Sequence, residues 1–355
     1  MMRWAKIVLL GLVCIACFLG TFLSVAHYFG GKGGHKGGAS HFHTATLLAF
    51  GDVNLGRLVG QKILSDEIDF PFQNVALGPE KPDIVFANLE SQLSDQDGET
   101  QDPNHNMIFT GPPAGALSLV SFGFTHVSTA NNHAFDYGTD ALLETLDRLD
   151  EENIAHVGTA RSADELYQPL MFESEGIRFA LFAVTDLMNF TKGWHEYVAI
   201  ADTGKLFPAV RAAANSADVV MMSFHGGEEY KEAPTKRVKE FAELCALQGV
   251  KVFLGHHPHV PYGVEEFHGS FLFHSLGNFV FYQPQSYWTQ RSFAAEIQFE
   301  KKDSGTVVSS LSLIPLRAGY QPAILTDSAE ISALQSRVQA LSNVPLTLKT
   351  KGTIH

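Results

Sequence analysis

Short apolar runs alternate with amphipathic stretches from Thr44 onward, and this alternation restricts the fold more than any other feature of the sequence. Apolar runs of strand length predict buried strands, whereas apolar residues spaced three and four positions apart predict helices. The predicted strands cover residues 45–50, 83–87, 125–129, 178–184, 219–224, 251–254 and 270–274. Strands that alternate with helices in this way predict an α/β fold.

Two of the intervening stretches have a clear helical pattern. Residues 139–152 place Leu142, Leu146 and Leu149 on one side of a helix, and residues 235–247 place their apolar residues similarly. The last third of the chain changes character, because residues 292–299 and 307–316 favour antiparallel strands that complete a sheet. A helix over residues 328–341 and a polar tail follow.

The N-terminus predicts a membrane anchor. Arg3 and Lys6 precede an apolar run over residues 7–26, and about 20 such residues match the hydrocarbon thickness of a bilayer. Positive residues before the run place the N-terminus in the cytoplasm, so we expect a single-pass protein of the cell membrane whose bulk is extracytoplasmic. A cleaved signal peptide is the alternative, because Ser24-Val25-Ala26 resembles a cleavage site, but the length of the run favours the anchor.

The expected domain organisation follows from this anchor. Residues 1–29 form the anchor or signal peptide, and the Gly-rich residues 30–43 form a flexible tether. Residues 44–320 form the main domain, and residues 321–355 form a C-terminal helix and tail. No linker after Gly38 divides the remainder.

Composition narrows the function. The formal net charge of -13 argues against a nucleic-acid partner, because phosphate backbones are bound by clustered Lys and Arg. The 16 histidines, many of them within short motifs, favour metal coordination. Outside the apolar N-terminal run, Cys245 is the one cysteine, and its helical context predicts a buried structural thiol rather than a nucleophile.

Polar residues that bind metals or transfer protons follow nearly every predicted strand. Because strand ends converge in α/β sheets, these residues are expected to meet. The segments concerned are GDVN (51–54), NLE (88–90), ANNHAFDYG (130–138), HGGEEY (225–230), GHHPH (255–259) and HSLGNF (274–279). Each has a structural alternative when taken alone, since Gly-Asp is common in turns and HPH triplets occur by chance. It is their combination that predicts a site.

Carboxylate, amide and imidazole groups together suit two divalent cations. Glu90 would bridge the cations, and Asp52, Asn132 and His225 would fill further positions. Such a pair lowers the pKa of a shared water and neutralises charge on a phosphoester. His133 would protonate the leaving alkoxide, and Asp136 would orient His133.

The ordered motifs resemble a known family, the bacterial CapA proteins of capsule and poly-gamma-glutamate production, within the calcineurin-like metallophosphoesterase superfamily. The matching pieces run from Gly51 to about Phe281 and are GDVNLGR, NLESQL, ANNHAFDYG, HGGEEY, GHHPHV and SLGNFVF. The resemblance implies a β-sandwich core flanked by helices, with metals at the strand ends, and an N-terminal transmembrane helix is also usual in that family.

The resemblance also implies roles for individual residues. Asp52 looks like the aspartate of the first motif, Glu90 stands where the superfamily usually has a bridging Asp, and Asn132 with His133 is similar to the Asn-His pair of the third motif. The implied metal ligands are Asp52, Asn54, Glu90, Asn132, His225, His257 and His259. Position 54 carries Asn where many superfamily members have His, and the second motif lacks the Gly-Asp of typical phosphatases.

Two functions remain open from the sequence. The first is an extracytoplasmic, metal-dependent phosphoester hydrolase of capsule or poly-gamma-glutamate biosynthesis that uses Mn, Fe or Zn. The second is a non-catalytic subunit of a polymer synthesis and export complex, in which the same cluster binds an anionic polymer or holds the fold. His133, which a structural metal site would not need, favours catalysis. Other polymer-synthesis subunits are the expected partners.

Overall fold

The structure, a computed structural model, describes residues 43–349. The predicted anchor (1–29), all but the last residue of the predicted tether (30–43) and residues 350–355 lie outside this range. Between residues 43 and 349, no helix combines the length and the apolar character that a bilayer crossing requires. The described part of the chain lies within one compact unit.

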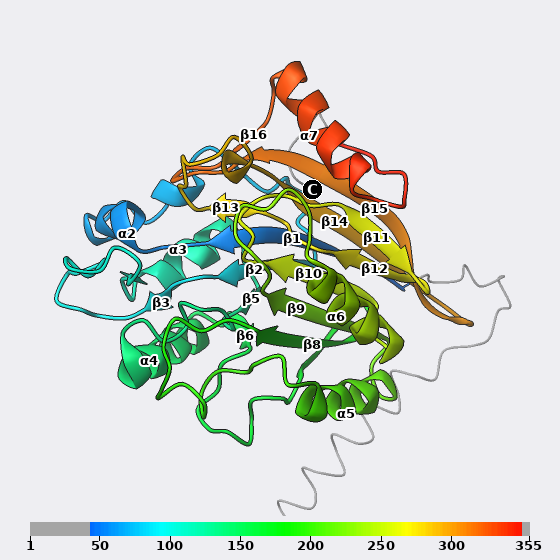
Figure 1. Cartoon of the computed structure of the whole chain (residues 1–355), viewed down its shortest axis with the longest axis horizontal. Coiled ribbons are helices and arrows are strands. Elements are labelled where there is room, and N and C mark those ends of the chain that lie inside the picture. The colour runs from blue at the N-terminus through cyan, green and yellow to red at the C-terminus, as the bar shows by residue number, and fades with distance from the viewer. Residues whose placement is uncertain (1–42, 350–355) are drawn as a thin grey trace, which may run out of the picture. The chain divides into compact units, whose positions relative to one another are not determined.

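Two mixed sheets form the centre of a mixed α/β fold (Figure 1). The first sheet has the strand order β16-β15-β14-β1-β2-β5-β6, with β13 beside β1, and the second has the order β11-β12-β10-β9-β8-β7. The strands of the first sheet are β1 (His43–Val53), β2 (Ile84–Leu89), β5 (His126–Ser128), β6 (Ala155–Val157), β13 (Asn278–Val280), β14 (Arg291–Lys302), β15 (Gly305–Arg317) and β16 (Ala323–Ile324). Those of the second are β7 (Leu170–Ser174), β8 (Ile177–Thr185), β9 (Val219–His225), β10 (Val252–His256), β11 (Val264–Phe267) and β12 (Ser270–Phe273).

The two sheets pack face to face as a β-sandwich. Alternate residues of their strands point inward and form one apolar core, which includes Leu47, Phe86, Phe179, Met221 and Phe293. Because side chains alternate across a strand, the intervening residues face outward and require a second covering layer. The central strands, such as β2, β9 and β10, are therefore buried on both faces, which explains their nearly continuous apolar runs in the sequence.

Helices cover the outer faces. Against the first sheet lie α2 (Arg57–Leu64) and α3 (Gly115–Phe122), where Ile63 and Leu119 join the apolar cluster that contains Phe50. Against the second sheet lie α5 (Thr203–Ala214) and α6 (Lys236–Leu247), where Phe241 packs 4.7 Å from Phe224 between ring centroids. The remaining elements are α4 (Gly138–Glu151), α7 (Ser328–Ala340), the short pair β3 (Gln92–Leu93) and β4 (Thr110–Gly111), and the 3-10 turns Phe70–Phe72 and Trp288–Gln290.

The structure confirms the strands and helices that the sequence predicts, with boundaries that differ by a few residues. It also contains elements that were not predicted, namely the helices α2, α3 and α5 and the short strands β3, β4, β6, β7, β11, β13 and β16. Cys245 is buried within α6, as expected. In Figure 1 the arrowheads of β1, β8, β9 and β10 point toward the same side of the molecule, so the carboxyl ends of strands from both sheets share one edge.

A close backbone approach fixes the end of β1. A Cβ atom on Gly51 would lie 1.8 Å from the carbonyl oxygen of Gly277, and the next residue, Asp52, donates its N–H to that same oxygen at 3.0 Å. Only glycine allows β1 to lie this close to the segment that leads into β13. This contact sets the position of the Asp52 side chain.

We expect Gly51→Ala to destabilise the fold, because its methyl group would meet backbone that cannot rotate away. The free energy of unfolding in urea should fall by roughly 3 kcal/mol, at the upper end of the usual cost of overpacking. Gly319→Ala is the matched control, since a Cβ there meets nothing within 4 Å. Equal stabilities of the two variants would contradict this account.

His126 makes the fold sensitive to acid. It is buried on β5 with its ring 4.3 Å from that of Phe172, and burial lowers the pKa of His126 from 6.5 to about 4. The unfolded chain therefore takes up a proton that the folded chain does not bind. This contribution to stability is fully present above pH 6.5 and is lost as the pH falls toward 4.

We predict that His126→Leu reduces the loss of stability between pH 7 and pH 4 by roughly 3 kcal/mol, the equivalent of this pKa difference. Urea denaturation at both pH values measures the change. His105→Leu, at an exposed position, should leave the pH dependence as in the wild type. An unchanged pH dependence in His126→Leu would show that this imidazole is protonated in the folded chain.

Candidate metal centre

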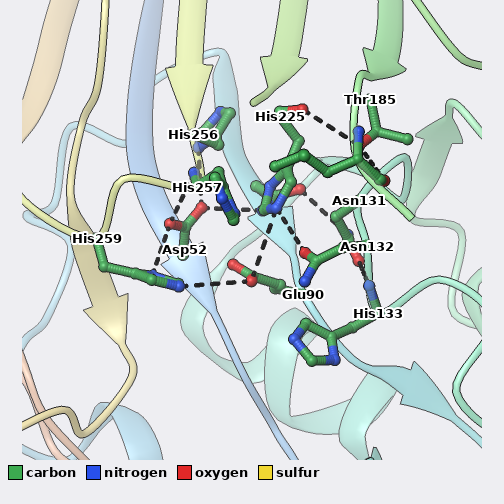
Figure 2. A network of polar contacts seen from close by, with 12 residues as sticks. Asp52, Glu90, Asn131, Asn132, His133, Thr185, His225, His256, His257 and His259 are labelled. Atoms are coloured by element: carbon green, nitrogen blue, oxygen red, sulfur yellow. Dashed lines mark hydrogen bonds and ion pairs between the residues drawn. The ribbon is translucent and has the colours of Figure 1, made fainter. Parts of the chain in front are cut away.

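Side chains that bind metals stand at the carboxyl ends of strands in both sheets, and strand register brings them level. In the first sheet, Asp52 of β1 lies opposite Asn88 of β2 and Asn278 of β13. In the second sheet, His225 of β9 lies opposite His256 of β10. Figure 2 shows Asp52 of the first sheet close to His225 and His256 of the second, with Glu90 beside them.

Glu90 is the central residue of this cluster. Its side chain is fully buried, and neither carboxylate oxygen has a hydrogen-bond partner within residues 43–349. Two sets of potential ligands include it, one formed with His257 and His259 and the other with Asp52 and His225, and within each set the ligand atoms lie within 4.8 Å of one another. Glu90 therefore belongs to both sets of potential ligands.

Asp52 is held by several groups at once. Its Oδ1 accepts a hydrogen bond from Asn88 Nδ2 at 2.9 Å and lies 3.2 Å from His256 Nδ1, while its Oδ2 lies 3.3 Å from His259 Nδ1. The backbone N–H of His257 also donates to Oδ2, at 3.3 Å.

The two buried carboxyls have opposite electrostatic environments. Burial by itself raises the pKa of Asp52, but hydrogen bonds and attraction from His256 and His259 outweigh it and hold that pKa well below its usual range. Burial, followed by the negative charge of Asp52, raises the pKa of Glu90 well above its usual range. A divalent cation beside Glu90 would reverse this shift.

The imidazoles suit metal coordination. Burial lowers the pKa of His225 well below its usual value and that of His257 to about 3, so both rings are neutral at pH 7, which is the form that binds metals. His257 and His259 both have positive φ angles, 92° and 58°. Such strain in residues other than glycine is concentrated at functional sites.

Amide side chains orient these ligands. Asn278 Oδ1 lies 2.8 Å from His259 Nδ1, which leaves Nε2 on the side of Glu90, at 3.8 Å from Oε1. Asn132 Oδ1 lies 2.8 Å from His225 Nε2, and Asn132 Nδ2 donates to Asn189 Oδ1 at 3.1 Å. Contacts of this outer layer usually fix the orientation of metal ligands.

His133 and Asp136 form a separate pair at the edge of the cluster (Figure 2). His133 Nδ1 lies 2.8 Å from Asp136 Oδ2, and the same oxygen accepts the backbone N–H of Phe109 at 3.0 Å. The ring of Phe109 stacks on the imidazole, with 4.1 Å between centroids. His133 belongs to neither set of potential ligands, so its imidazole is available to hold or transfer a proton.

The structure brings together nearly all the residues that the sequence predicts for the site. Asn54 is different, because its Oδ1 accepts a hydrogen bond from the backbone N–H of Gly56 at 2.7 Å, as in an Asx turn. Its role as a ligand stays a prediction, as do the metal-binding roles of the other residues.

Several neighbours of the centre were not predicted as site residues. Asn88 could have been inferred, because it lies two positions before Glu90 on a strand and so shares its face. Asn131, His256 and Asn278 lie within the quoted motifs. Asn189 lies in a loop outside every motif, and no sequence signal indicates that it would contact Asn132.

A family model and two curated relatives place this sequence among the same group of proteins. The family model described as bacterial capsule synthesis protein PGA_cap matches residues 46–283. A PGA biosynthesis protein CapA from Bacillus subtilis is 30% identical over 284 residues, which cover 78% of this chain and 73% of that protein. A capsule biosynthesis protein CapA from Bacillus anthracis is 28% identical and covers 76% of this chain and 67% of that protein.

Among solved structures, the calcineurin-like phosphoesterase YfkN from Bacillus subtilis is similar, with 13% identity and a TM-score of 0.45. The match covers 84% of this chain and 97% of that one.

Because Glu90 belongs to both sets of potential ligands, we expect Glu90→Gln to reduce the bound divalent metal in both at once. The full chain, loaded with Mn, Fe or Zn and dialysed, should retain much less metal than the wild type by elemental analysis. Glu240→Gln, at an exposed position of α6, is the control and should bind as the wild type does. Full retention of metal by Glu90→Gln would show that the cations bind elsewhere.

Proposed function

The chain belongs to the bacterial capsule synthesis family PGA_cap, and on that basis we propose that it is a metal-dependent, phosphoesterase-like hydrolase of capsule or poly-gamma-glutamate biosynthesis. In this proposal the β-sandwich is a calcineurin-like metallophosphoesterase fold, and the centre binds two divalent cations, either Mn, Fe or Zn. The observation that carries the proposal is the position of Glu90 in two adjacent sets of ligands.

The residues present fit such cations. A buried carboxylate whose two oxygens have no hydrogen-bond donor is costly unless a cation balances it. Neutral imidazoles and carboxylate oxygens together are a donor set that Mn, Fe and Zn accept. Bound there, the cations would activate water and offset negative charge on a phosphoryl group. Asp52, Glu90, His225, His257 and His259 would hold them.

The chain's own residues supply the proton chemistry. The carboxylate of Asp136 fixes the ring of His133, because its Oδ2 lies 2.8 Å from Nδ1, and this leaves Nε2 to protonate the leaving oxygen of an ester. Phe109 covers one face of the imidazole and limits contact with water. His133 therefore acts as a general acid and Asp136 as a positioning residue.

We further propose that residues 1–29 anchor the protein in the cell membrane and that residues 44–320 work outside the cytoplasm. The support is Arg3 and Lys6 before the apolar run of residues 7–26. In this proposal the protein contacts the membrane, an anionic polymer or phosphoester substrate, and other polymer-synthesis subunits.

We predict that His133→Ala retains its metal but hydrolyses a generic phosphodiester at least about a hundredfold more slowly, the usual contribution of a general acid. Elemental analysis and turnover of bis(p-nitrophenyl) phosphate, measured on the same preparation of the full chain, separate the two effects. His156→Ala, on β6, is the control.

Metal binding without turnover by the wild type across a broad panel of esters would contradict the hydrolase proposal. It would favour instead a non-catalytic subunit of a polymer synthesis and export complex. Wild-type turnover with no loss in His133→Ala would retain the hydrolase and remove this residue from the mechanism.

A further inference from the structure

Arg57, the first residue of α2, lies between two aromatic rings that also contact the candidate centre. Its guanidinium carbon is 4.4 Å from the centroid of the Phe109 ring and 5.9 Å from that of Phe281. Phe109 stacks on His133, and the Phe281 ring lies 4.8 Å from that of His259. Arg57 is thus one ring away from the proposed general acid on one side and from a proposed ligand on the other.

Among the residues that the structure describes, this arginine has no carboxylate partner. Within residues 43–349, every other arginine except Arg211 forms an ion pair with Asp or Glu, and Arg211 is exposed. Arg57 Nη2 donates to the carbonyl oxygen of Asn106 at 2.8 Å, whereas Nε is buried and has no acceptor.

Without a carboxylate partner among the described residues, the positive charge of the Arg57 guanidinium loses part of its hydration and gains no ion pair in return. Burial lowers the pKa of Arg57, against the opposing effect of the negative charge on Glu90, yet a guanidinium stays charged at neutral pH. An anion that met the free N–H groups would offset the lost hydration through charge-assisted hydrogen bonds.

A small cavity lies beside this side chain. Its volume is about 40 Å³, and its lining includes Arg57, Asn54, Tyr282 and Tyr320. The rings of Tyr282 and Tyr320 stack, with 4.3 Å between centroids. One water molecule needs a cavity of roughly 10–15 Å³. The cavity therefore has room for the oxygen atoms of a carboxylate or a phosphate group.

The backbone of Arg57 is held in an unfavourable conformation. Its φ angle is +55°, in the left-handed region that residues other than glycine rarely adopt. Two contacts with Thr100 maintain it, because the N–H of Arg57 donates to the Thr100 carbonyl at 2.9 Å and Thr100 Oγ1 donates to the carbonyl of Arg57 at 2.8 Å. These contacts fix the backbone from which the side chain extends, and the guanidinium itself is held by the Asn106 carbonyl and the Phe109 ring.

We propose that Arg57, with Tyr282 and Tyr320, forms an oxyanion subsite beside the metal centre that binds a second anionic group of the substrate. The inference rests on the proposed function and narrows the substrate class. The substrate is a phosphoester that carries, besides the scissile group, a carboxylate or a further phosphate. Arg57 and the rings of the cavity select for that group.

Anion binding to the full chain tests the subsite without relying on turnover. Inorganic phosphate and glutarate are titrated calorimetrically into protein kept metal-free with a chelator. Wild type should bind at least one of them, Arg57→Met should bind it at least tenfold more weakly, and Arg211→Met should bind it as the wild type does. Preference for phosphate or glutarate identifies the second group. Failure of the wild type to bind either anion, or equal binding by Arg57→Met, would overturn the proposal.

A measurement on the wild type alone covers the case in which Arg57→Met does not fold. Phenylglyoxal modifies arginine, and peptide mass spectrometry measures the modification at each site. Phosphate or glutarate should protect Arg57 and leave Arg211 unprotected, whereas equal modification of Arg57 with and without anion would contradict the subsite. If anion binding depends on Arg57 but no ester is hydrolysed, the subsite stands and the hydrolase proposal fails.

Discussion

The candidate centre depends on a buried carboxyl group that no hydrogen-bond donor of the described residues reaches. Glu90 is fully buried, and the adjacent Asp52 raises its pKa further. Leaving a charged group in such a place costs several kcal/mol unless a counter-charge is present. The surrounding residues supply neutral imidazoles instead of cationic side chains. The centre therefore has the charge and the donor atoms that divalent cations would complete.

The sandwich is what makes this arrangement possible. Each sheet contributes strand ends to one edge, so that ligands from β1 and β2 meet ligands from β9 and β10. Glycine precedes the polar residue at two of these ends, and a Cβ on Gly51 or Gly255 would lie within 2.2 Å of a carbonyl oxygen of the neighbouring segment. Apolar packing between the sheets and beneath the helices supports these strand ends. The packed core thus fixes the positions of the side chains at the candidate centre.

The parts of the fold that follow from local pattern could be predicted from the sequence, and the parts that depend on distant contacts could not. Buried strands are recognisable in the sequence as apolar runs. Because parallel strands run in the same direction, their carboxyl ends lie at the same edge of the sheet. Helix α5 contains Pro208, and α3 is apolar around most of its surface, so neither has a clear amphipathic pattern. The contact of Asn189 with Asn132 and the lack of an ion pair at Arg57 depend on loop positions that no periodicity encodes.

The charges around the centre set the conditions under which an anionic ester could bind. The chain has a net charge of -13, and the ionised carboxylate of Asp52 lies where such an ester would have to bind. Because burial keeps His225 and His257 neutral, these rings do not offset that charge. Arg57 supplies one positive charge beside the centre, which is too little to balance the Asp52 carboxylate and a phosphoester together. In the proposed function, cations at the centre would supply the remaining positive charge, so the affinity for an anionic ester should rise with the amount of bound metal, whereas a small anion at the Arg57 subsite needs no metal.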